Sequence, residues 1–261
     1  MKIYILTDLE GVAMVSRWDQ TREPDASPES KAKSMKLLTW EVNAAIDGIL
    51  DVDQQAEIVV FDGHGSGGID IIDFHEKAKL IPYGKSLKPP YFMDESFNAL
   101  FFVGQHAMAG TENAPLCHTY SSKSIEYFKI NKKLVGEFGA RALLAGTFNI
   151  PTVFIAGDDK AVAEASALVP RIHGAVVKWG LGIEMALHLS AKAAHRLIRQ
   201  AAAKAVQNIA SIEPVKVETP YCQEIRVREG QNLGYWLELG AKKIDDRTVI
   251  IESNNICDLD I

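Results

Sequence analysis

Cysteines, long apolar runs and excess positive charge are all scarce in this sequence. Three cysteines among 261 residues lie far apart without a CxxC pair, which indicates neither a disulfide framework nor a thiolate metal site. No apolar run reaches the roughly 18 residues of a membrane span, and residues 3–6 are too short and too early for a secretory signal. We therefore expect a cytoplasmic protein without a membrane partner. The net charge of −6, with scattered lysines and arginines, argues against a nucleic-acid partner.

The sequence does contain enough apolar material for a large core, with 47% hydrophobic and 24% charged residues. Short β-branched or aromatic runs alternate with amphipathic segments over roughly the first 180 residues. This pattern is typical of an α/β fold with a largely parallel sheet flanked by helices. Apolar residues spaced by three, four and seven positions between Leu38 and Ile49 predict the first crossover helix. The expected strands are residues 3–6, 57–61, 99–103, 152–156 and 175–177.

The pattern changes near Pro214. An alanine-rich helix is expected from Ser190, a suitable N-cap, to about Ile209. Strand-like segments follow at residues 224–227 and 247–251. The predicted units are residues 1–212, an α/β metal-binding catalytic domain, and residues 213–261, a smaller C-terminal α+β subdomain rich in β-structure.

Two carboxylates, Asp8 and Glu10, directly follow the first expected strand. Residues two apart in an extended chain point to the same side, so both carboxylates would share one patch. Because two adjacent anions repel each other, a metal ion is the natural functional explanation. A solvated acidic loop would show the same pattern.

Histidines follow the next two expected strands, His64 after Phe61-Asp62-Gly63 and His106 after Gly104-Gln105. Open α/β sheets place their ligands at this carboxyl edge of the strands. Asp62 is expected to hydrogen-bond a ring nitrogen of His64 and to fix its tautomer. A single surface histidine in a loop would need no function, but the repeated arrangement favours a site where the strand ends converge.

Glu137 and His118 extend this set. A hairpin at residues 125–133 precedes Gly136, and Glu137 is expected in the first turn of a helix over residues 138–148, where it would be a further ligand or a favourable N-terminal charge. Carboxylates and imidazoles together suit zinc, and the set is too large for one tetrahedral ion, so we expect two zinc ions per subunit that share Asp8. His118 is a candidate for proton transfer or for stabilising an oxyanion, or else a loop histidine bonded to the backbone.

The order of these motifs resembles the signature of the D-aminopeptidases of peptidase family M55. The resemblance covers roughly the first 180 residues and includes Ile155-Ala156-Gly157-Asp158-Asp159. It implies that Asp8 bridges two metal ions and that His118 is the catalytic histidine. The ligand set implied by the resemblance is Asp8, Glu10, His64, His106 and Glu137.

The resemblance also implies an activity and an assembly. The chain would be a metallo-aminopeptidase that uses a binuclear zinc site to release N-terminal residues, D-amino acids such as D-Ala among them, from short peptides or amides. It would be a homo-oligomer, a ring-shaped decamer whose active sites face an inner chamber.

Two other functions remain open from the sequence. A magnesium-dependent phosphatase of the haloacid dehalogenase type would use the acidic pattern at Asp8 and Asp158-Asp159, but it leaves His64 and His106 unexplained. Asp158 also has an ordinary explanation as a helix N-cap. A non-catalytic relative that binds peptide or metal would keep the ligands without turnover.

Overall fold

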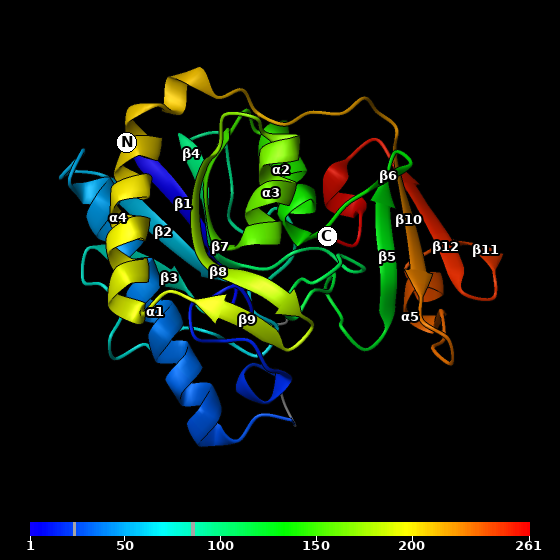
Figure 1. Ribbon diagram of the computed structural model, residues 1–261. Helices are drawn as coiled ribbons and strands as arrows, with labels where there is room; N and C mark the ends of the chain where they lie inside the picture. The colour runs from blue at the N-terminus through cyan, green and yellow to red at the C-terminus, as the bar shows by residue number, and fades with distance from the viewer. Residues whose placement is uncertain (23–24, 85–86) are drawn as a thin grey trace.

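Two β-sheets stand next to each other in the computed structural model, which describes residues 1–22, 25–84 and 87–261 (Figure 1). The larger sheet has the strand order β3-β2-β1-β4-β7-β8-β9, and all its pairs are parallel except β8 with β9. Its strands are β1 (Lys2–Thr7), β2 (Glu57–Asp62), β3 (Ala78–Ile81), β4 (Ala99–Gln105), β7 (Thr152–Asp158), β8 (His173–Gly182) and β9 (Met185–His188).

Four long helices flank this sheet (Figure 1). From β1 to β2 the chain proceeds toward one edge of the sheet, and from β4 through β7 to β8 it proceeds toward the other edge. Because the crossovers between parallel strands are right-handed, the first helix lies on one face of the sheet and the next two lie on the other face. The last long helix returns to pack against the first. The helices are α1 (Pro28–Leu50), α2 (Glu137–Thr147), α3 (Asp159–Leu168) and α4 (Ala191–Gln207).

Local sequence explains where these helices begin. The Ser27 side chain accepts a hydrogen bond from Ser30 N, and Pro28 occupies the first turn of α1. Asp158 caps α3 by accepting hydrogen bonds from Lys160 N and Ala161 N, which confirms its interpretation as a helix N-cap. Glu137 opens α2 after Gly136, so its predicted place in the first turn is confirmed.

The second sheet has the order β11-β12-β10-β5-β6 and is antiparallel throughout (Figure 1). It combines a hairpin from the middle of the chain with strands from its C-terminal part, around a small core that contains Phe128, Ile225 and Trp236. The predicted division at residues 212 and 213 stays a prediction, although this hairpin lies within the first predicted unit. The elements are β5 (Ile125–Ile130), β6 (Lys133–Leu134), β10 (Tyr221–Val227), α5 (Gly234–Glu238), β11 (Lys242–Asp245) and β12 (Thr248–Ser253).

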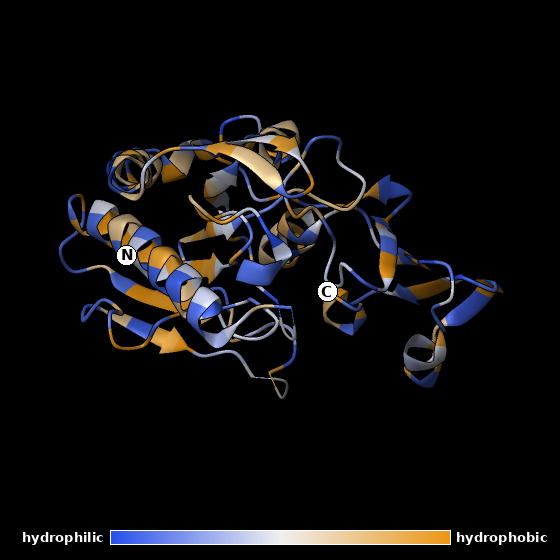
Figure 2. Ribbon diagram, turned by 60° about the horizontal axis from the view of Figure 1, so that its bottom comes forward, coloured by the Kyte–Doolittle hydropathy of each residue, from blue (hydrophilic) through white to orange (hydrophobic). Residues whose placement is uncertain are grey.

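The main core lies on both faces of the larger sheet. Every residue of β4 and of β7 is buried, and the Phe101 and Phe154 rings pack 5.2 Å apart between them. Figure 2 shows hydrophobic residues along the central strands, whereas α1 alternates between hydrophobic and hydrophilic residues along its length. Among the described residues, no helix is long and apolar enough to cross a membrane. The five expected strands are present, and the predicted fold class is confirmed.

Candidate metal centre

The loops that follow β1, β2 and β4 meet at one edge of the larger sheet. β1 lies between β2 and β4, with Thr7 aligned to both Asp62 and Val103, so the three strands end at the same level. The direction of chain progression reverses here, between β1 and β4. Such a switch point leaves a crevice at the carboxyl ends of the strands, where open α/β sheets place their ligands.

Two glycines allow the loops after β1 and β4 to pack backbone against backbone. Gly11 N donates to Gly104 O over 2.7 Å, and Gly104 has a positive φ of 77°. A Cβ atom added at Gly104 would lie 2.0 Å from Asp8 O. Only glycine fits this approach, which brings the Asp8 loop against the strand end that carries His106.

All six residues singled out from the sequence lie together at this edge. Ligand atoms of Asp8, Glu10 and His64 lie within 4.8 Å of one another, and those of His106, His118 and Glu137 form a second such group. Asp8 Oδ2 lies 3.0 Å from His106 Nε2 and so links the two groups. Asp8, Glu10, His64 and His106 are buried. The structure therefore shows the convergence, while the role of each residue as a ligand stays a prediction.

The buried carboxylates of this cluster are stabilised by nearby positive charge, from protons or from a cation. Burial, reinforced by the Glu10 carboxylate, raises the pKa of Asp8 to about 7. Burial alone would lower the pKa of His64, but the Glu10 carboxylate 3.3 Å away outweighs it and raises this pKa to about 9. Large pKa shifts of buried, neighbouring groups are typical of functional sites, and a bound cation would stabilise these carboxylates in the same way as a proton.

Two polar atoms show that the side chains suit a metal ion. His106 Nδ1 lies 2.9 Å from Ala107 O, so in the neutral ring this nitrogen donates and Nε2 presents its lone pair to the cluster. Within the described part of the chain, His106 Nε2 and Glu10 Oε2 are buried without a hydrogen-bond partner. Buried lone pairs without a hydrogen-bond partner, among carboxylates and imidazoles, are suited to binding a cation.

Asp62 supports His64 differently from our expectation. Its carboxylate accepts hydrogen bonds from Gly68 N and Ile69 N and not from the His64 ring, so that expectation was wrong. The glycine-rich loop folds back over Asp62 and fills its acceptor sites. Gly67 O, in the same loop, lies 3.3 Å from His64 Nδ1 and holds the ring. Asp62 thus orients His64 through the loop.

His118 stacks on His106 with ring centroids 4.0 Å apart and an interplanar angle of 12°. Its Nδ1 lies 2.8 Å from Leu116 O, which leaves Nε2 facing Glu137 Oε1 at 3.8 Å. Burial, together with the nearby His106, lowers the pKa of His118 to about 4. The ring is therefore neutral near pH 7, with an acceptor nitrogen directed toward the cluster.

Known proteins are similar to this chain in sequence and in fold. The sequence profile of peptidase family M55, described as D-aminopeptidase, matches residues 1–259. The chain belongs to the M55 family. The D-aminopeptidase of Bacillus subtilis (strain 168) is 30% identical over 219 residues, covering 82% of this chain and 77% of that protein.

A solved structure from the same organism has the same fold. The Zn-dependent D-aminopeptidase DppA from Bacillus subtilis, described as a self-compartmentalizing protease, matches with a TM-score of 0.90 and 25% identity. The match covers 99% of this chain and 93% of that chain. Membership of the M55 family does not favour the phosphatase alternative, and the cap at Asp158 removes the acidic motif on which that alternative partly rested.

Behind the cluster, this M55 chain buries a lysine that could not be singled out from the sequence. Lys178 on β8 is fully buried, and its Nζ donates to Glu10 O and, over 2.6 Å, to Val15 O. The Glu41 carboxylate accepts from Ala13 N in the same loop over 2.9 Å. Lys178 and Glu41 thus fix the backbone of the loop that carries Glu10.

Replacing Lys178 with Met should weaken the metal site without touching a ligand. The variant leaves two buried carbonyls without their donor and removes the positive charge that acts on the Asp158 and Glu41 carboxylates, so we expect a loss of about 3 kcal/mol in unfolding free energy. We also expect metal affinity to fall roughly 10- to 100-fold, as for other groups that support ligands. Chelator competition and thermal unfolding measure both effects. The exposed Lys192→Met is the matched control, and unchanged affinity in K178M would contradict the positioning role.

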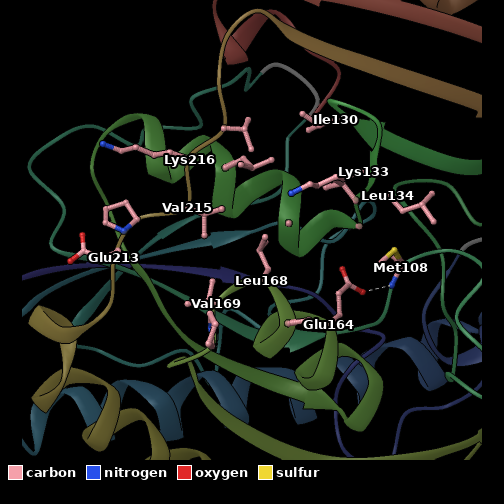
Figure 3. A pocket seen from close by; sticks show the side chains of 18 of the residues that line it. Met108, Ile130, Lys133, Leu134, Glu164, Leu168, Val169, Glu213, Val215 and Lys216 are labelled. Atoms are coloured by element: carbon pink, nitrogen blue, oxygen red, sulfur yellow. Dashed lines mark hydrogen bonds between the residues drawn. The ribbon is translucent and has the colours of Figure 1, made fainter.

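Two cavities lie near these M55 residues, and only one contains the cluster. The cavity at the cluster, of about 320 Å³, is lined by Asp8, Glu10, His64, His118 and Glu137 together with Trp18, Arg22 and residues 120–123. A larger cavity of about 740 Å³ lies between α2, α3, the β5–β6 hairpin and residues 212–217 (Figure 3). The described residues that line it include no histidine or cysteine. Glu164, which accepts from Met108 N there, supports the backbone that follows His106.

Proposed function

We propose that this chain is a zinc-dependent aminopeptidase that removes N-terminal residues, D-amino acids among them, from short peptides or amides. The observation that carries the proposal is the pair of histidine–carboxylate groups joined by the 3.0 Å contact between Asp8 and His106. Membership of the M55 family and the similarity to a Zn-dependent D-aminopeptidase support it.

Each ligand would be held by its own element. Asp8 and Glu10 follow β1 and His64 follows β2, so these three would hold one zinc ion. His106 follows β4 and Glu137 opens α2, and with Asp8 shared between the groups they would hold the second. When bound, paired zinc ions polarise a carbonyl group and activate water. Tyr120 N donates to Glu137 Oε1 over 2.7 Å and keeps this carboxylate turned toward His106.

His118 would act on the substrate rather than only complete the site. Its neutral ring is fixed from two sides, by the stack on His106 and by the Trp18 ring, whose centroid is 5.6 Å away at a steep angle. An imidazole held in this way accepts a proton through Nε2 and, once protonated, donates to a developing oxyanion. Both steps need the orientation that Leu116 O imposes on Nδ1.

The assembly and the location form part of the same proposal. The β8–β9 hairpin exposes five large apolar side chains, which supports an interface between copies of the chain and is compatible with a ring-shaped decamer. The three cysteines are free, as is usual in the reducing cytoplasm. The exposed side chains of the hairpin are Trp179, Leu181, Ile183, Met185 and Leu187.

A panel resolved by chirality tests the activity. Zinc-loaded protein is expected to release p-nitroaniline from D-alanine p-nitroanilide and alanine from D-alanyl peptides, with a lower kcat/KM for the L-enantiomers. N-acetylated D-alanine p-nitroanilide is the matched control, because an aminopeptidase needs the free amine. Equal cleavage of the acetylated substrate would refute the aminopeptidase assignment.

A further inference from the structure

A pair of cations stands at the mouth of the cavity that contains the cluster. Arg22 and Lys123 both line this cavity, which is otherwise acidic at its base through Asp8, Glu10 and Glu137. Neither cation contacts those carboxylates in any ion pair of the described residues. Positive charge therefore lies at the rim, away from the metal ligands.

Arg22 is held in place while keeping hydrogen-bonding capacity. Its guanidinium carbon lies 4.1 Å from the centroid of the Trp18 ring, and Nη1 donates to Ser122 Oγ over 2.7 Å. Nε donates to Asp25 Oδ2 over 2.6 Å. A guanidinium has five N–H groups, and in residues 1–22, 25–84 and 87–261 these two bonds are its only ones to acceptors. The N–H groups that remain can bind a planar anion such as a carboxylate through two parallel hydrogen bonds.

One exposed carboxylate partly balances these two charges. Asp25 Oδ2 contacts Arg22 and also lies 3.6 Å from Lys123 Nζ. Exposed ion pairs of this kind contribute little free energy, so a second carboxylate can compete for the same cations. Among the described residues, two cations against one anion leave this part of the cavity lining with a net positive charge.

We propose that Arg22, assisted by Lys123, binds the C-terminal carboxylate of a short peptide whose N-terminal residue lies at the metal ligands. This inference rests on the proposed function. The centroid of the Trp18 ring lies 4.1 Å from the guanidinium carbon and 5.6 Å from the His118 ring centroid, which places the guanidinium within about 10 Å of the His118 ring. Extended peptide spans roughly 3.5 Å per residue, so this reach suits a substrate of about two or three residues.

The test compares free carboxylates with their neutral amides. The substrates are D-Ala-D-Ala, D-Ala-D-Ala-D-Ala and their C-terminal amides, with D-alanine p-nitroanilide as a substrate without a carboxylate. The measured quantity is the ratio of kcat/KM for each free peptide to that for its amide. In Arg22→Met we expect this ratio to fall by about 10-fold or more, through KM, and in Lys123→Met to fall less. Arg196→Met, an exposed change on α4, should keep the ratio of the unaltered protein.

A variant of opposite sign separates the inference from misfolding. Asp25→Asn removes the competing carboxylate, so its ratio is expected to rise, which damage to the fold would not produce. If the anilide is cleaved but R22M, K123M and D25N all keep the unaltered ratio, the inference is overturned and the proposed function stands. If zinc-loaded protein cleaves none of these substrates, the proposed function fails and the inference fails with it.

Discussion

Removal of the metal ions with a chelator is expected to lower hydrolysis of D-alanine p-nitroanilide by about 1000-fold or more, roughly 4 kcal/mol of transition-state stabilisation. The expectation follows from the cluster itself, where three carboxylates and three imidazoles converge and, among the described residues, no lysine or arginine forms an ion pair with these carboxylates. Adding zinc back should restore turnover and should also raise the unfolding temperature, because an ion that binds only the folded chain stabilises it. Activity that persists after metal removal, verified by elemental analysis, would contradict the metal assignment.

Substitution of a predicted ligand tests whether the loss of activity on metal removal arises at this cluster. His106→Ala removes the side chain that joins Asp8 to Glu137, so we expect loss of bound zinc together with a loss of activity of similar size. His195→Gln on α4, a half-buried histidine outside the cluster, is the matched control and should keep both. Zinc content and turnover measured on the same preparation decide the question. Full zinc binding in H106A would exclude His106 from the ligand set.

The central strands were predictable because their residues are buried on both faces. Continuous apolar runs such as Phe101-Phe102-Val103 mark such strands without reference to the rest of the chain. The polar ends were missed, since β2, β4 and β7 each continue into Asp62, Gln105 or Asp158. The backbone ladder extends through these residues although their side chains carry no apolar signal. They are also the residues next to the site.

Edge strands and pairings between distant strands are marked by weaker apolar patterns in the sequence. β3 and β9 lie at the two edges of the larger sheet, where no residue is fully buried, so they lack a long apolar run. The pairing of β5 with β10 joins segments almost a hundred positions apart, Gln223 opposite Ile130. No local pattern encodes such a partnership. The membership of the second sheet therefore had to come from the structure.

The part of the site formed by residues that follow strands was predictable from the sequence. The buried side chains that hold the backbone of these loops were not. Asp8, His64 and His106 each come within three residues of the end of an apolar run, so the topology of parallel strands was enough to bring them together. Lys178 and Glu41 do not belong to the cluster and instead bind the backbone of the loop that carries Glu10. A signal for Glu41 was available, because it lies three residues after Leu38 on the apolar face of α1, where a carboxylate needs a reason.

Replacing His118 by Gln is the change that separates catalysis from metal binding. We expect kcat to fall by about 100- to 10,000-fold, the usual contribution of a positioned acid–base group, while zinc content stays at that of the unaltered protein. The reason is geometric, since the Asp8–His106 link between the two groups does not involve His118. The low pKa of His118 keeps its imidazole neutral and able to accept a proton, which an amide cannot do.

Three measurements on His118→Gln give distinct answers. Zinc per subunit reports whether Nε2 is also a ligand, and a loss of zinc alongside activity would assign His118 to the metal set. Turnover of D-alanine p-nitroanilide reports the chemical step, and His195→Gln, which changes a histidine outside the cluster in the same way, is the matched control. If H118Q retains full kcat with full zinc, the catalytic role is wrong. If the unaltered protein binds zinc but turns over no substrate, and H118Q changes neither property, the chain is a non-catalytic member of the family.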